Sequence, residues 1–126
     1  MKKVLTILIV AALLQSCTEK RDTSIKGKWV DHMLDQDKTY HDFIAYFKAD
    51  GTYDGIDGGK VVIPGGHYEQ KGDTIILNDM ICAPYDIGMY KMVLYAQDSM
   101  KLELISDSCD ARREGTIPFR FKRMKQ

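Results

Sequence analysis

The chain has 126 residues, of which 44% are hydrophobic, and it carries 18 basic and 18 acidic side chains. This length suits a single domain with one core. The balanced charge provides no strong field that would attract polyanions, so we expect no nucleic-acid partner.

A hydrophobic segment opens the chain. Lys2 and Lys3 precede the run from Val4 to Leu14, in which Thr6 is the only polar residue. A helix of that length spans roughly 16 Å, only half of the ~30 Å hydrocarbon core, so the run fits a signal peptide better than a transmembrane helix. The next residues, Leu14-Gln15-Ser16-Cys17, resemble the lipobox of bacterial lipoproteins. The alternative is an ordinary secretory signal followed by a chance cysteine.

The lipobox resemblance implies a cellular location and a lipid anchor. Cys17 would receive a diacylglycerol, residues 1–16 would be removed, and the polar residues 17–24 would tether a domain of residues 25–126 to a membrane. The mature part would have a formal charge of −2, because the removed segment carries two lysines and no acid. Thr18-Glu19 is not an aspartate retention signal, so the outer membrane is favoured over the inner one. The face of the membrane, periplasmic or external, stays open.

Two cysteines remain in the mature part, Cys82 and Cys109. Export places them in an oxidising compartment, where an even pair favours a disulfide. Closing this loop would stabilise the fold by about 3–4 kcal/mol on the chain-entropy model. A metal pair or a redox pair is the alternative, but the chain has no CxxC motif and no histidine near either cysteine.

The rest of the chain alternates with a period of two, which is typical of strands. Expected strand segments begin near residues 25, 43, 52, 60, 74, 89, 100 and 117, the last alternating set being Ile117, Phe119 and Phe121. Asp50-Gly51 predicts a hairpin turn. Glycines at 55, 58 and 59 predict breaks, and Pro64-Gly65-Gly66 predicts a break or a bulge. The stretch 106–116 is expected to be a polar connection.

About eight short strands and no convincing helix of three turns indicate an all-β fold. We expect a small antiparallel meander barrel, with a sandwich as the second choice.

Basic residues gather near the C-terminus, between acidic and apolar residues, and are expected on a solvated strand face rather than in a nucleic-acid patch. These residues are Arg112, Arg113, Arg120, Lys122, Arg123 and Lys125.

The order of several motifs resembles bacterial lipocalin-like lipoproteins of the calycin group. Gly27-Lys28-Trp29 looks like their Gly-x-Trp signature, residues 47–53 and 68–75 look like their hairpins, and Cys109 followed by residues 119–123 looks like their ending. The resemblance covers about residues 25–124. It implies a barrel whose closed end is formed by Trp29 beneath a basic residue, Arg120 or Arg123, through a cation–π contact. The expected barrel is short, so its cavity is either shallow or filled by side chains.

Aromatic strand residues are the candidates for lining a ligand cavity, because they combine a flat apolar body with, in tyrosine, a hydroxyl group. Their simpler interpretation is packing on half-buried strands. The candidates are Phe47, Tyr53, Tyr68, Tyr90 and Tyr95.

No catalytic or metal-binding pattern stands out. His32, His41 and His67 have no ligand spacing, and the acidic, glycine-rich residues 54–59 lack the oxygen spacing and closing glutamate of a calcium loop. We therefore expect no cofactor, no metal and no enzymatic activity.

The sequence favours an anchored module that binds a small apolar or amphipathic ligand in the cell envelope. The alternative is an interaction or inhibitor protein that docks an envelope protein through its barrel-rim loops.

Overall fold

The computed structural model describes residues 20–84 and 86–125 of the chain. The hydrophobic segment, the lipobox-like motif and Cys17 lie outside these residues, so the expectations for them stay predictions. Within the described ranges, no helix is long and apolar enough to cross a membrane.

Eight antiparallel strands form a closed barrel, in which each strand pairs with its neighbours in sequence and the last pairs with the first. The predicted meander barrel is thus confirmed, and the sandwich is excluded. A short helix, α1 (Asp110–Thr116), precedes the last strand. The strands are β1 (Gly27–Leu34), β2 (Tyr40–Phe47), β3 (Thr52–Asp57), β4 (Lys60–Lys71), β5 (Thr74–Asn78), β6 (Gly88–Tyr95), β7 (Ser99–Ser106) and β8 (Phe121–Arg123).

The core follows the alternation of the strands, because every second side chain points into the barrel. In β2, Ala45 and Phe47 face inward, as the pattern predicts, and in β6 the inward set begins with Tyr90 and Met92. The buried cluster consists of Ile25, Trp29, Ala45, Phe47, Tyr53, Ile75, Leu77, Tyr90, Met92, Met100, Leu102 and Phe121.

The β2–β3 connection is the hairpin that Asp50-Gly51 predicts. Gly51 has a φ of 85°, and the Asp50 carboxylate accepts hydrogen bonds from the backbone N–H and the hydroxyl of Thr52. An aspartate that bonds to the backbone two residues ahead stabilises such a turn locally.

The expected break at Gly55 is wrong. The β3 strand continues through Gly55 and turns only at Gly58-Gly59, where both residues have positive φ. A Cβ atom at position 55 would lie 2.9 Å from Cδ1 of Ile63, so the glycine allows β3 and β4 to approach closely. A lone glycine in a strand pattern therefore marked a close contact here rather than an end.

The second irregularity, at Pro64-Gly65-Gly66, is a bulge within a continuous β4. Tyr53 pairs with Gly66 and Gly55 pairs with Ile63, so two residues of β4 oppose one residue of β3. Of the two outcomes that the sequence left open, the structure has the bulge.

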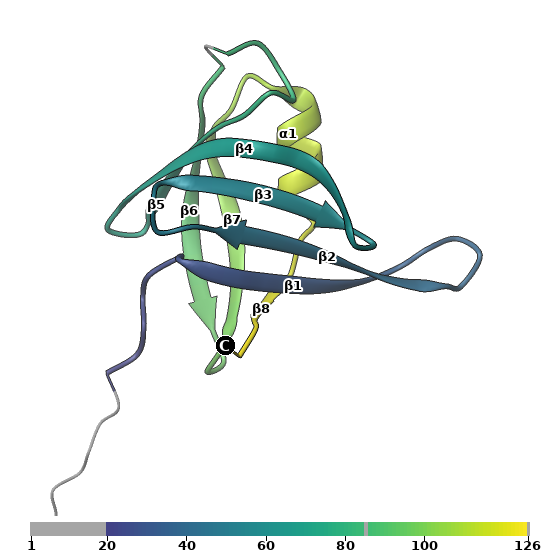
Figure 1. The fold of residues 1–126 in the computed structure, drawn as a ribbon. Helices are drawn as coiled ribbons and strands as arrows, with labels where there is room; N and C mark the ends of the chain where they lie inside the picture. The colour runs from purple at the N-terminus through teal and green to yellow at the C-terminus, as the bar shows by residue number, and fades with distance from the viewer. Residues whose placement is uncertain (1–19, 85, 126) are drawn as a thin grey trace, which may run out of the picture.

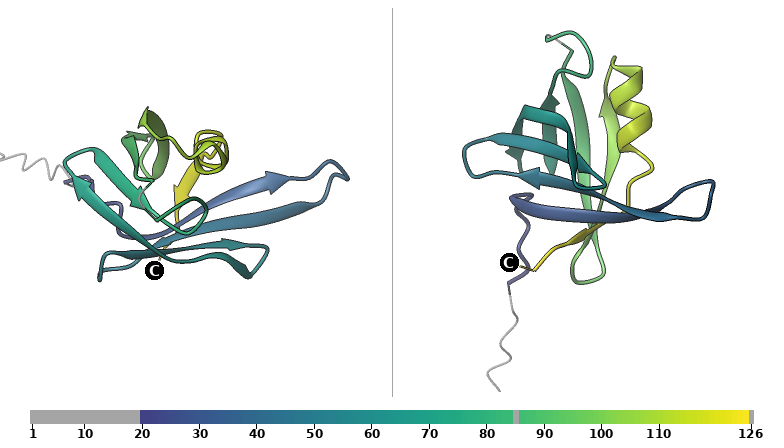
Figure 2. Two further views of the ribbon diagram at one scale, coloured as in Figure 1. Left: turned by 90° about the horizontal axis from the view of Figure 1, so that it is seen from above. Right: turned by 45° about the vertical axis from the view of Figure 1, so that its right-hand side comes forward.

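The C-terminal part differs from expectation. The stretch 106–116, expected to be a polar connection, contains α1, and the last strand begins only at Phe121. Ile117 caps the helix, and Phe119 lies in the loop that follows. The helix lies beside β7 and in line with the three-residue β8, so it completes the wall where β8 is too short (Figures 1 and 2).

The two ends of the barrel are built differently. One end carries α1 and the β5–β6 loop, whereas the β6–β7 hairpin, the C-terminus and the segment leading back to residue 20 lie at the other (Figure 1; Figure 2, right). The first is called the helix end below, and the second the Trp29 end.

Candidate functional site

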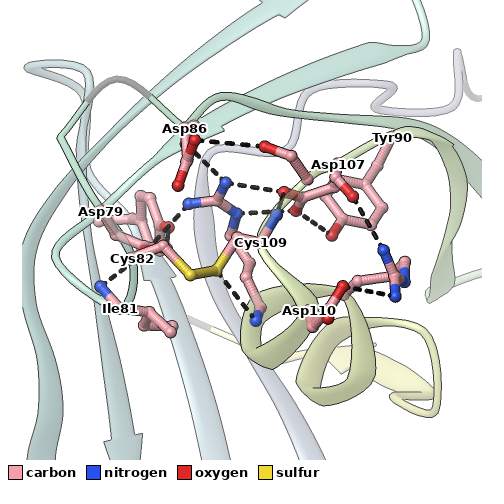
Figure 3. The surroundings of a disulfide bond; sticks show 12 residues. Asp79, Ile81, Cys82, Asp86, Tyr90, Asp107, Cys109 and Asp110 are labelled. Atoms are coloured by element: carbon pink, nitrogen blue, oxygen red, sulfur yellow. Dashed lines mark hydrogen bonds and ion pairs between the residues drawn. A yellow bond between two sulfur atoms is a disulfide. The ribbon is translucent and has the colours of Figure 1, made fainter.

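The helix end is held together by the predicted disulfide. Cys82 in the β5–β6 loop is bonded to Cys109, the N-cap residue of α1, and this pairing is confirmed (Figure 3). Cys109 also accepts a hydrogen bond on Sγ from the backbone N–H of Arg112, and its own N–H donates to Oδ1 of Asp107 at 2.9 Å. The short helix is therefore fixed at its first turn by a covalent bond and by local capping contacts.

Arg112 is the centre of a buried polar cluster, which we define as Arg112, Asp79, Asp107, Tyr53 and Tyr90. Only 2% of Arg112 is exposed. Its Nε and Nη2 donate to the two carboxylate oxygens of Asp107 at 2.8 and 2.9 Å. Its Nη1 donates to Oδ1 of Asp79 at 3.2 Å (Figure 3). The bidentate contact with Asp107 fixes the plane of the guanidinium as well as its position.

Two tyrosine hydroxyls complete the cluster. Tyr53 donates to Oδ2 of Asp79, and Tyr90 donates to Oδ2 of Asp107 at 2.5 Å. Burial, followed by these bonds to carboxylates, raises the pKa of both tyrosines well above the usual value. Both phenols are therefore protonated donors at any physiological pH.

The charged partners are held in their ionised forms. Burial opposes the charge on Asp107, but the hydrogen bonds from Arg112 and Tyr90 outweigh it and lower the pKa of Asp107. Burial likewise opposes the charge on Arg112, and the carboxylates of Asp107 and Asp79 outweigh it and raise the Arg112 pKa. A buried pair of this kind survives because each charge is matched by opposite charge and hydrogen bonds.

A pocket of about 190 Å³ opens beside this cluster, between α1 and the inner faces of β2 to β4. Its walls are mainly apolar, and its polar side chains are those of Tyr53, Asp54, Asp79, Arg112 and Thr116. The apolar lining includes Phe43, Ala45, Phe47, Ile63, Leu77, Ile81, Leu102, Phe119 and Phe121. A concave, apolar site with a few fixed polar groups is the usual form of a small-molecule site.

The five ligand-lining candidates do not come together. Phe47 and Tyr53 line the pocket, with their rings stacked 5.4 Å apart. Tyr90 is fully buried and belongs to the polar cluster instead. Tyr68 packs its ring edge on Phe47 and donates to the carbonyl of Lys48, and it faces a wider, polar hollow outside the barrel. Tyr95 lies at the Trp29 end and is 38% exposed.

At the Trp29 end, one of the two arginines considered lies over the tryptophan. The Arg123 guanidinium is 4.1 Å from the Trp29 ring centroid, and it donates to the carbonyls of Lys26 and Ser24. Trp29 is fully buried and donates from Nε1 to the carbonyl of Ile25. Arg120 lies elsewhere and donates to carbonyls in the loop after α1.

The sequence did not predict the polar cluster, and the expected solvated strand face is wrong for Arg112. Several of the neighbouring residues in the sequence are charged, which favours a position on the surface. Nothing in a single sequence marks one arginine as buried. Asp79 and Asp107 carry a weak signal: each lies within three residues of a disulfide cysteine. A disulfide brings the residues next to its two cysteines close together in space, so these two aspartates lie in the same region.

The histidines take no part in the pocket. His32 lies 2.5 Å from a carboxylate oxygen of Asp42 on the neighbouring strand, and His41 lies 3.1 Å from both Asp35 and Asp57. In residues 20–84 and 86–125, no three His, Cys, Asp or Glu side chains are placed to hold a metal ion together.

Comparison with known proteins gives no significant match to any family model, curated protein or solved structure. A closed eight-stranded barrel by itself supports many unrelated functions. The function must therefore be inferred from the chemistry of the pocket and of the polar cluster.

Proposed function

We propose that this chain is a lipid-anchored, lipocalin-like protein of the cell envelope that binds a small apolar or amphipathic molecule in the pocket at the helix end. The single observation that carries the proposal is the composition of this pocket. Apolar side chains from β2, β4, β5, β7 and β8 line the pocket, together with the buried polar groups of Tyr53, Asp79 and Arg112. Apolar surface removed from water would provide affinity, and the polar groups would orient the ligand.

Binding fits the polar cluster better than catalysis does. The carboxylates of Asp79 and Asp107 already accept hydrogen bonds from Arg112 and from the tyrosines. A general base or nucleophile has to be available to a substrate, and these groups are occupied with one another. Their arrangement suits a rigid wall.

Anchoring would leave the pocket accessible. The segment that leads back to residue 20 leaves from the Trp29 end (Figure 1). The pocket is lined by residues of α1 and of the β5–β6 loop, at the helix end. A lipid on Cys17 would therefore hold the barrel at a membrane with the pocket directed away from it. The Cys17→Ala substitution should release the chain to the soluble fraction, and continued membrane association would contradict the anchor.

The ligand proposal is tested by blocking the pocket. Ala111 lines the pocket from the exposed face of α1, so Ala111→Trp should obstruct the opening without disturbing the core. Glu114→Trp adds the same side chain to the same helix away from the pocket and is the matched control. Mass spectrometry of organic extracts from the purified proteins should find a co-purifying molecule in the wild type and the control only. Equal recovery from all three proteins, or from none, would contradict the proposal.

A second candidate function, docking of an envelope protein, is favoured by exposed apolar side chains at the helix end. Met80 and Ile87 in the β5–β6 loop are 70% and 51% exposed, and Leu104 and Ile105 at the end of β7 are also exposed. Apolar side chains gathered on a rim are a frequent feature of protein interfaces. Lysine substitutions at Met80 and Ile87 should abolish cross-linking to a specific envelope protein if this function holds. They should leave the co-purifying molecule in place if the pocket binds a small ligand.

A further inference from the structure

The pocket carries enough chemistry to specify its ligand, an inference that rests on the proposed binding function. We infer that the pocket selects an uncharged molecule about the size of one aromatic ring, bearing one polar group, and that it discriminates against carboxylates. Three observations lead to this: the size of the pocket, the charge of the polar cluster and the hydrogen-bonding capacity that remains there.

The size of the pocket limits the ligand to about one ring. Its volume of about 190 Å³ falls below the roughly 300–1,000 Å³ of drug-sized sites, and an apolar cavity of about 150 Å³ is enough to bind benzene. The wall is aromatic: the ring centroids of Phe43 and Phe119 lie 4.5 Å apart, and those of Phe119 and Phe121 lie 4.8 Å apart, both stacked. A flat ring would extend this stack at the preferred spacing.

The charge of the cluster disfavours an anion. Arg112 is the only basic residue that lines the pocket within the described part of the chain. It already contacts two carboxylates, those of Asp79 and Asp107, which leaves a formal excess of one negative charge. A further carboxylate in the lining, that of Asp54, is paired with Lys48 at 2.7 Å. A ligand carboxylate would add a second unmatched negative charge beside apolar walls, where the cost of burying it is greatest.

The remaining hydrogen-bonding capacity suits a neutral polar group. Arg112 has five N–H groups, and the bonds described above and one from Nη2 to the carbonyl of Asp86 occupy four. One N–H on Nη1 has no acceptor among the residues that the structure describes. The hydroxyl of Tyr53 donates to Asp79, and its oxygen can still accept a hydrogen bond. An amide or hydroxyl can use this one donor and this one acceptor. An ammonium or amidinium has donors only, so it would leave the N–H of Arg112 without an acceptor and would lie beside a guanidinium of the same charge.

Three probes of one shape test the charge preference: benzamide, benzoate and benzamidine carry the same ring and a similar planar head, with charges of zero, minus one and plus one. Saturation-transfer NMR titration of the purified full chain at neutral pH should give the tightest binding for benzamide. Benzoate should bind at least about tenfold more weakly, which corresponds to about 1.4 kcal/mol. Benzoate or benzamidine binding as tightly as benzamide would overturn the inference while leaving ligand binding intact. No binding of any probe, together with no co-purifying molecule, would overturn both.

A charge-neutral variant tests the cause. Asp79→Asn removes the excess negative charge with almost no change of shape, so the preference for benzamide over benzoate should shrink several-fold. Asp98→Asn makes the same substitution at the Trp29 end, where the carboxylate lies 3.8 Å from Lys122, and should leave the preference unchanged. An unchanged preference in a folded Asp79→Asn variant would overturn the electrostatic explanation. If that variant does not fold, as judged by its thermal unfolding, the three probes on the wild type decide the inference.

Discussion

The two ends of this barrel each use an arginine, in opposite ways. At the Trp29 end, Arg123 lies over an indole ring, bonds to backbone carbonyls and stays partly in water. At the helix end, Arg112 is buried between two carboxylates and is only 2% exposed, so water would replace few of its contacts if a partner were lost. The first arginine covers a core that is already closed. The second joins Asp79 of the β5–β6 loop to Asp107 before α1, and a pocket remains beside it.

The largest expected effect separates these two arginines directly. Arg112→Met should reduce the free energy of unfolding by about 3–5 kcal/mol, because it leaves two buried carboxylates without a counter-charge. Arg123→Met should cost only about 1–2 kcal/mol, since it removes a partly exposed cation–π contact and two hydrogen bonds to carbonyls. Denaturant unfolding of both variants measures the difference. Equal losses would mean that the two ends do not differ as described.

The disulfide should have the next largest effect, and its effect on local opening should be greatest at the helix end. Replacing Cys82 and Cys109 together by serine should lower the free energy of unfolding by about 3 kcal/mol, because the loop between them is no longer closed in the unfolded chain. Amide hydrogen exchange should accelerate most in α1 and the β5–β6 loop, beyond the acceleration that the lower free energy of unfolding causes in β1 and β2. Uniform acceleration over the whole barrel would contradict a local role.

Two glycine substitutions test how tightly the helix end is packed. A Cβ atom at Gly88 would lie 2.5 Å from Oδ2 of Asp107 and 2.9 Å from Nε of Arg112, so Gly88→Ala should cost about 1–3 kcal/mol. Gly115 in α1 has no heavy atom within 4 Å of such a Cβ. Gly115→Ala should therefore stabilise the chain by about 0.5–1 kcal/mol through helix propensity. Thermal unfolding temperatures that shift in the same direction for both would refute this contrast.

The smallest effect concerns pH and again distinguishes the two ends. The pKa of Asp107 is lowered in the folded chain, so its contribution to stability is complete above its ordinary value near 3.8 and is lost as the pH falls through the lower folded value. Unfolding measured between pH 7 and pH 2.5 should show this acid loss in the wild type and in Arg123→Met. Asp107→Asn should show a shallower loss over the same window. An identical acid dependence in all three proteins would contradict the assignment to Asp107.

Hairpin turns and strand faces were predictable because their signals are local. Asp50-Gly51 forms the expected turn, and Ala45 and Phe47 face inward as the alternation requires. The break at Gly55 was predicted wrongly because a glycine has the same sequence signal whether it ends a strand or admits a neighbouring side chain. Only the position of Ile63 on the next strand distinguishes the two cases.

The candidate site was harder to predict, because its members come from most of the strands, from α1 and from the β5–β6 loop. Phe47 and Tyr53 were recognised as aromatic strand residues, but the same reasoning selected Tyr95, which the barrel places at the opposite end. Alternation predicts the inner face of a strand without predicting which end of the barrel a residue occupies. That position depends on how the neighbouring strands are staggered.

The sequence by itself predicted the all-β meander and about eight strands, because period-two alternation and turn residues act over short distances. It also favoured the pairing of Cys82 with Cys109 over a metal or redox pair, because a lipid on Cys17 would leave each of them a single partner. Only the tertiary structure decided that Arg112 is buried, that Asp79 and Asp107 meet it, and that a pocket lies beside them. The physical reason is that the environment of a charged side chain depends on its solvent exposure and its partners. Both are set here by the disulfide and by the short helix that completes the barrel wall.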